Sequence, residues 1–160
     1  VGAGDSLLFS PLALCLVLHP REHPPGIPWG DGDGLNNQSI VLLLRIGHQA
    51  ILLTGDAEVE AEADLLRYSD LLKAPVVKVG HHGSETASSE PFVRRVDAEF
   101  AVVSVGETNR FGLPDTEPLQ RWCRSGARVL RTDKQGAICF QIFADSIRFD
   151  DAIPVPAHER

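Results

Sequence analysis

The alternation of short apolar runs with helical segments constrains the fold of this chain more than any other feature of its sequence. Three segments with helical patterning, at residues 57–68, 88–96 and 115–125, separate four apolar runs of strand length, at residues 49–54, 74–79, 99–105 and 127–133. Strands that alternate with helices in this way indicate a parallel sheet covered by helices, an α/β fold class. In the first helical segment, Val59, Ala63 and Leu66 are predicted to share one face.

The remaining segments add strands on both sides of this pattern. Gly47 and His48 indicate a hairpin before the run at residues 49–54, and the proline- and glycine-rich residues 19–37 indicate a long loop. Further strands are expected at Ser6–Phe9, Ala13–Leu18, 39–46, 136–143 and 146–150. With 160 residues, we expect one domain over residues 1–150 and a disordered tail over residues 151–160. The start at Val1 suggests a piece cut from a longer protein.

Polar loops follow the first three of the four runs. Gly55 and Asp56 follow the first, Gly80–Ser84 the second and Gly106–Gly112 the third. Right-handed crossovers make the strands parallel, so these loops are expected along one edge of the sheet. Ligands of open α/β sheets bind at that carboxyl edge.

The candidate catalytic and metal-binding residues at this edge are Asp56, His81 and His82. A carboxylate and neutral imidazoles suit zinc, manganese or iron, and one aspartate can bridge two ions about 3.5–4 Å apart. Such a pair of ions activates water for displacement at phosphorus, and Ser84 and Asn109 are predicted to hydrogen-bond a phosphate. Taken singly, Asp56 is typical of a helix N-cap and each histidine of a hydrogen-bonded turn. Their occurrence at the ends of successive strands favours a metal site.

The net charge of −7 arises in the first part of the chain, where residues 1–66 contain nine acidic and two basic side chains. Residues 67–160 contain thirteen of each. An evenly acidic surface repels nucleic acid, but an acidic patch beside a bound divalent cation need not. The charge therefore excludes neither a nucleic acid substrate nor a small phosphodiester.

Four stretches carry a resemblance to a known family. Residues 36–66, with Thr-Gly-Asp at 54–56, residues 72–93, with Gly-His-His-Gly-Ser at 80–84, residues 101–115 and residues 129–140 resemble the C-terminal metallo-β-lactamase-fold domain of the ComEC family. These are DNA-internalisation competence proteins of bacterial inner membranes. The similarity runs from about Gly4 to Phe143, which is most of the chain.

The resemblance implies metal-dependent hydrolysis of phosphodiester bonds, with two manganese or zinc ions in the complete domain. It assigns Asp56 as the bridging ligand, one of His81 and His82 as a ligand and the other as a contact to the scissile phosphate. It also implies substrate-binding residues near the site, which are Asn37, Ser39, Ser84, Asn109 and Arg110. The implied partners are single-stranded DNA during uptake and the membrane channel of the parent protein, on the extracytoplasmic face.

Two departures from the family pattern qualify this expectation. Gly112-Leu113-Pro114 stands where the family has Gly-His-Pro, so one polar contact is lost. The first histidine–aspartate cluster of the superfamily is not found in the sequence, so the chain is expected to be a partial αββα sandwich, lacking the N-terminal half. Alone it should bind metal weakly, hydrolyse little and self-associate through exposed apolar sheet surface.

Three functions therefore remain open at the level of the sequence. The first is a nuclease or phosphodiesterase domain of a DNA-uptake channel. The second is a catalytically degenerate module that binds and guides DNA in the same machinery. The third keeps the fold but acts on RNA or a small phosphodiester.

Overall fold

A seven-stranded sheet, whose strands lie in sequence order, forms the centre of the computed structural model, which describes residues 1–21 and 34–150. Its strands are β1 (Ser6–Ser10), β2 (Ala13–His19), β3 (Val41–Ile46), β4 (Gln49–Leu53), β5 (Val76–Lys78), β6 (Phe100–Val103) and β7 (Arg128–Arg131). The predicted tail at residues 151–160 and most of the predicted loop at residues 19–37 lie outside the described residues.

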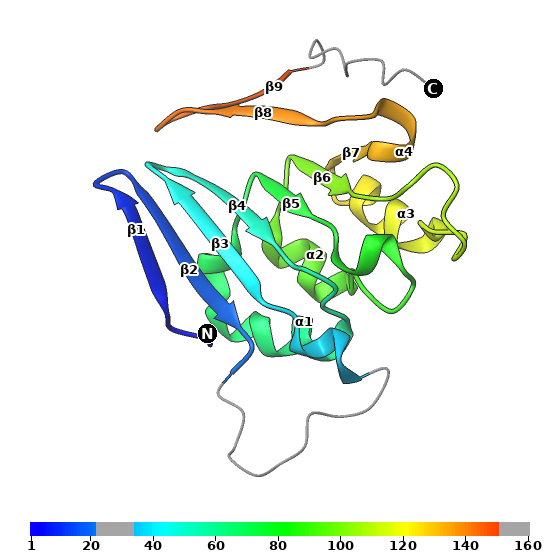
Figure 1. Ribbon diagram of the computed structural model, residues 1–160, viewed down its shortest axis with the longest axis horizontal. Coiled ribbons are helices and arrows are strands. Elements are labelled where there is room, and N and C mark those ends of the chain that lie inside the picture. The colour runs from blue at the N-terminus through cyan, green and yellow to red at the C-terminus, as the bar shows by residue number, and fades with distance from the viewer. Residues whose placement is uncertain (22–33, 151–160) are drawn as a thin grey trace.

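The sheet changes from antiparallel to parallel at β4. Strands β1 to β4 pair antiparallel, and the predicted hairpin at Gly47 and His48 joins β3 to β4. Strands β4 to β7 pair parallel, as the alternation with helices predicts. The connecting helices α1 (Val59–Leu65), α2 (Glu90–Val96) and α3 (Thr116–Arg124) lie on one face of the sheet (Figure 1). The predicted α/β class is confirmed.

Shorter helices complete the connections. One α-helical turn, α4 (Thr132–Gln135), follows β7, and the 3₁₀ helices of the described residues are η2 (Asn36–Gln38), η3 (Leu66–Leu72) and η4 (Gly80–Gly83). In the described parts of the chain, no helix combines the length and apolar character that crossing a membrane requires.

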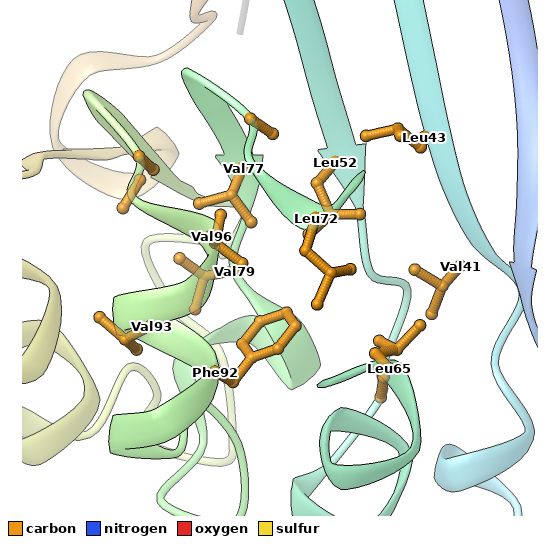
Figure 2. Packing of buried hydrophobic residues seen from close by; sticks show 14 of the residues in the cluster. Val41, Leu43, Leu52, Leu65, Leu72, Val77, Val79, Phe92, Val93 and Val96 are labelled. Carbon is orange, nitrogen blue, oxygen red and sulfur yellow. The ribbon is translucent and has the colours of Figure 1, made fainter. Parts of the chain in front are cut away.

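The main core lies between the sheet and its helices. Figure 2 shows Leu52 and Val77 of the sheet facing Leu65 of α1 and Phe92 of α2, all of them buried. Fully buried aliphatic and aromatic side chains each stabilise a fold by about 1.5–3 kcal/mol relative to exposure. This burial holds the helices against the parallel strands and fixes the loops at their carboxyl ends.

A hairpin of β8 (Cys139–Ile142) and β9 (Ile147–Asp150) covers part of the opposite face. Phe140 and Phe149 pack on Phe100 of β6, with ring centroids 5.3 and 6.0 Å from it. Edge-to-face and tilted pairs at this spacing stabilise an apolar layer beyond the area they bury.

The part of that face nearest the N-terminus is more open. A mainly apolar hollow of about 520 Å³ is lined by Leu7 and Phe9 of β1 and by Val17 and Leu42, among others. Leu7 is 65% exposed and Phe9 67% exposed. This apolar surface is suited to self-association, which stays a prediction.

Helix α1 packs through a different face from the predicted one. Val59 and Ala63 are exposed, whereas Ala61 and Leu65 are buried in the core. Glu62 is buried with them. This carboxylate accepts hydrogen bonds from the backbone N–H groups of Ser88 and Ser89, at 2.6 and 2.7 Å, and so ties α1 to the start of α2.

Burial raises the pKa of Glu62 above its ordinary value, and the hydrogen bonds from Ser89 and Ser88 together with the charge of Arg121 oppose the rise. Between the ordinary and the raised pKa, the folded chain binds more protons at this site than the unfolded chain. The stability contributed by the protonated form is therefore complete below about pH 4.5 and is lost as the pH rises through the raised pKa.

Glutamine cannot ionise, so we expect the Glu62→Gln variant not to lose this contribution to stability as the pH rises. The free energy of unfolding of the wild type minus that of the variant should fall between pH 4 and pH 7 in urea titrations. Glu60→Gln, at an exposed position of the same helix, serves as the control. A difference for Glu62→Gln that stays constant or grows with pH would contradict the account.

Candidate functional site at the carboxyl edge of the parallel strands

The carboxyl ends of β4, β5 and β6 meet at one edge of the sheet, as the sequence predicts. There the loops after these strands surround a hollow of about 470 Å³. The hollow is lined by Asp56, His81, His82, Ser84, Glu85, Thr86, Phe111, Leu113 and Asp115. The structure therefore brings together four of the predicted site residues, which are Asp56, His81, His82 and Ser84.

Asp56 and His82 face each other across part of the hollow. The Nε2 atom of His82 lies 3.4 Å from Oδ1 of Asp56, and its Nδ1 lies 2.7 Å from the carbonyl oxygen of Ser104. Because a carbonyl only accepts, Nδ1 carries the hydrogen, and Nε2 of the neutral ring presents a lone pair to the carboxylate. Two acceptors in this arrangement require a proton or a cation between them.

The separation of these two atoms fits a shared metal ion. A direct charge-assisted hydrogen bond between nitrogen and a carboxylate spans about 2.7–2.9 Å, shorter than the observed distance. Two ligands of a tetrahedral zinc ion, each at about 2.0–2.2 Å, lie about 3.4 Å from each other. Asp56 and His82 are therefore compatible with two corners of a metal site, and equally with an ion pair when the ring is protonated, and the hydrogen bond to Ser104 orients the imidazole in either case.

Lys78 neutralises part of the charge of Asp56. Its Nζ lies 3.5 Å from Oδ1 of Asp56 and donates to the carbonyl of Gly55. Burial lowers the pKa of Lys78, and the charge of Asp56 opposes this shift. The ammonium group of Lys78 therefore links the turn at Gly55 and Asp56 to the end of β5.

His81 is directed to a different carboxylate. Its Nδ1 lies 2.9 Å from Oε1 of Glu58, which is 8% exposed and also accepts a 2.7 Å hydrogen bond from the hydroxyl of Thr86. His81 and His82 adopt φ values of 42° and 54°, in the left-handed region that non-glycine residues seldom occupy. This turn points the two adjacent rings to different partners, and such strain occurs most often at functional sites.

Asn37 and Ser39 support the site from outside the hollow. Oδ1 of Asn37 accepts from the N–H groups of Glu58 and Ala61, at 3.0 and 3.1 Å, so it caps the start of α1. The hydroxyl of Ser39 accepts from the N–H of Asp56 at 3.0 Å. Asp56 itself is not the N-cap of this helix, since Glu58 occupies that position. The substrate contacts predicted for Asn37 and Ser39 stay a prediction.

Asn109 braces its own loop. Its side-chain amide donates to the carbonyls of Gly106 and Leu113, at 3.1 and 2.8 Å, and its oxygen accepts from the N–H of Leu113 at 3.0 Å. The phosphate contact predicted for Asn109 would require these bonds to be exchanged. Arg110 is exposed, and its guanidinium lies 4.8 Å from the ring centroid of Phe111.

Six residues of the site were not predicted from the sequence: Lys78, Glu58, Glu85, Thr86, Phe111 and Asp115. Lys78 had a usable signal, because a single cation inside the apolar run at residues 74–79 needs a buried partner. The spacing of Glu58 and Thr86 gives no sign that they meet, since they come from different segments. Phe111 lies in a recognised loop, but its exposure follows only from the fold.

Fold and site together define a mixed α/β protein with an acidic, histidine-containing hollow at the carboxyl edge of its parallel strands. No family model matches the chain. The chain is 40% identical over 106 residues to ComE operon protein 3 of Bacillus subtilis strain 168, a match covering 66% of this chain and 14% of that protein. It is 41% identical over 107 residues to Competence protein ComA of Neisseria gonorrhoeae, covering 66% and 15%.

A third relative extends the match slightly. The chain is 34% identical over 117 residues to Recombination protein 2 of Haemophilus influenzae, covering 73% of this chain and 15% of that protein. The predicted resemblance to ComEC-family competence proteins is therefore confirmed over about two thirds of the chain. The chain spans only 14–15% of the length of these relatives.

The described residues contain no group of three or more histidine, cysteine, aspartate or glutamate side chains placed to hold a metal ion. We therefore expect the 160-residue chain to bind zinc or manganese weakly, through Asp56 and His82, with a dissociation constant no tighter than micromolar in isothermal titration calorimetry. His82→Ala should abolish this binding. His48→Ala, at the exposed β3–β4 turn, should leave it unchanged. Nanomolar binding by the wild type would contradict the expectation.

Proposed function

We propose that this chain is the second half of a metallo-β-lactamase-like αββα domain that hydrolyses phosphodiester bonds of DNA during uptake. The names of two relatives, Competence protein ComA and Recombination protein 2, support a role in handling DNA. The parent protein would hold the domain beside its membrane channel, on the extracytoplasmic face. The upstream half would add the metal ligands that complete the site.

The facing pair of Asp56 and His82 is the observation that carries this proposal. Their 3.4 Å separation matches two ligands of one ion and exceeds a direct hydrogen bond. We assign His82 as the metal ligand of the adjacent histidines, because Nδ1 is occupied by Ser104 and Nε2 is directed to Asp56. The second oxygen of Asp56 is then available for a second ion.

The charge of the hollow supports a metal-dependent reaction. Asp56, Glu85 and Asp115 are three carboxylates in its lining, and no lysine or arginine of the described chain lines it. A phosphodiester in such a hollow is repelled unless a cation lies between it and the carboxylates. Asp56 and His82 would hold a divalent ion in this hollow, and such an ion would offset the repulsion and supply activation of water and stabilisation of negative charge on the phosphate oxygens.

The protein's own groups orient the substrate and the ligands. Glu58 accepts the hydrogen of His81 Nδ1, so a hydrogen bond from His81 Nε2 to a phosphate oxygen requires a second proton on the ring. Ser84 lies in the same lining, where its hydroxyl is 3.1 Å from that of Thr86. Lys78 holds Asp56 in place, and Asn37 and Ser39 fix the backbone on which Asp56 and Glu58 lie.

One observation favours the alternative of a module that guides DNA without cleaving it. The described residues provide two facing ligands, and a catalytic zinc site has three protein ligands. The two functions differ in the upstream half. An intact histidine–aspartate cluster there favours the hydrolase, and its replacement by other residues favours the guiding module.

The experiment is manganese-dependent cleavage of single-stranded DNA by a longer protein that includes the upstream half. We expect cleavage by the wild type and a loss of at least about 100-fold in Asp56→Asn, since even outer-shell partners of a metal contribute 10–100-fold. Asp145→Asn, an exposed aspartate of the β8–β9 turn, should cleave like the wild type. A folded wild type that cleaves with neither manganese nor zinc would refute the hydrolase and favour the guiding module.

A further inference from the structure

An exposed aromatic residue stands at the edge of the candidate site. Phe111 is 71% exposed and lines the same hollow as Asp56 and His82. The guanidinium of Arg110 lies over its ring, 4.8 Å from the centroid. Arg110 therefore occupies one face of the ring, which leaves the other face accessible.

The loop that carries Phe111 is held in place by hydrogen bonds. Asn109 closes the loop through its three hydrogen bonds to Gly106 and Leu113. Asp115 connects the end of the loop to the turn that contains the histidines. Its N–H donates to the carbonyl of Gly83 at 2.9 Å, and its carboxylate accepts from the N–H of Glu85 at 2.7 Å. The ring of Phe111 is thus presented on a pre-organised loop, so binding a ligand costs little ordering.

Contact with Gly83 fixes the distance between this loop and the histidine turn. A methyl group added at Gly83 would come within 2.7 Å of Cβ of Pro114, and Gly83 has a φ of +81°. Only glycine permits this approach at this backbone angle. Phe111 and the histidines therefore belong to one rigid arrangement.

We propose that Phe111 is a stacking platform for one nucleobase of a single-stranded DNA whose phosphodiester lies at Asp56 and His82. This inference rests on the proposed function and names the part of the substrate that the hollow recognises beyond its phosphate. Every base has a flat face that stacks on an aromatic ring, and in a single strand that face is available. Arg110 adds a cation next to the ring, 4.8 Å from its centroid, which attracts the strand's phosphates.

A binding assay in millimolar manganese tests this without cleavage, because the 160-residue chain alone is expected to hydrolyse little. The probe is a fluorescein-labelled oligothymidylate, titrated with the 160-residue chain and followed by fluorescence anisotropy. We expect Phe111→Ala to weaken binding by about 5- to 150-fold, the range found for single base–aromatic stacks. Phe111→Tyr should retain the binding, because a phenol ring stacks as well.

Phe143 provides a matched control. It is 45% exposed and also has a guanidinium near its ring, that of Arg148, at 5.5 Å. It lies beside the β8–β9 turn, where Ala144 accepts a hydrogen bond from His48 of the β3–β4 turn, at the opposite end of the sheet from the hollow. Phe143→Ala should leave oligonucleotide binding unchanged.

Two further arms separate stacking from charge. An oligonucleotide of abasic sites should bind the wild type and Phe111→Ala equally, because it has no base to stack. Arg110→Gln should lower the salt dependence of binding by about one phosphate contact, whereas Phe111→Ala should leave the salt dependence unchanged.

The proposal is overturned if Phe111→Ala binds oligothymidylate like the wild type, if it weakens the abasic strand equally, or if the wild type does not bind. These outcomes are independent of the cleavage experiment, since they measure binding by the 160-residue chain and not hydrolysis by the longer protein. Loss of cleavage with stacking intact would refute the hydrolase and leave the platform standing. Cleavage by the longer protein, together with unchanged oligothymidylate binding in Phe111→Ala, would support the hydrolase and refute the platform.

Discussion

The parallel pairing of β4, β5 and β6 is the constraint on which the whole site depends. It brings the ends of three strands to one edge, although their loops are separated by about 25 residues of sequence each. Direct hydrogen bonds join the strand ends at this edge. The hydroxyl of Thr54, after β4, donates to the carbonyl of Lys78 in β5 at 2.7 Å. The N–H of Val79, after β5, donates to the carbonyl of Val102 in β6 at 2.8 Å. A methyl group at Gly80 would come within 2.5 Å of the carbonyl oxygen of Ala57, so the histidine turn lies directly on the turn of Asp56.

The buried carboxylates organise the space behind this edge. Glu58 joins His81 and Thr86, both of the β5–α2 connection, to Asn36 of η2. Glu62, one turn later, fixes the start of α2. A buried carboxylate is costly unless it is hydrogen-bonded, and each of these two has several donors. Glu58, the N-cap of α1, and Glu62, within α1, thus hold the β5–α2 connection, which carries the histidines, against this helix.

The sequence was sufficient to predict the parts of the structure that depend on periodicity and strand ends. The hairpin at Gly47 and His48, the parallel strands and the meeting of Asp56 with His81 and His82 follow from local patterns and from the handedness of crossovers. The interacting face of α1 was not predictable in this way, because Glu62 is buried by long-range hydrogen bonds that no helical pattern reveals. Likewise, the use of Asn109 within its own loop and of Asn37 as a cap for α1 depends on the folded backbone.

The central claim is that Asp56 and His82 hold one metal ion between them. Crystals of the chain grown in millimolar zinc, measured at the zinc absorption edge, test it most directly. The account predicts an anomalous peak at about 2.0–2.2 Å from both Oδ1 of Asp56 and Nε2 of His82. A direct hydrogen bond between these two atoms in saturating zinc, with no peak between them, would contradict it.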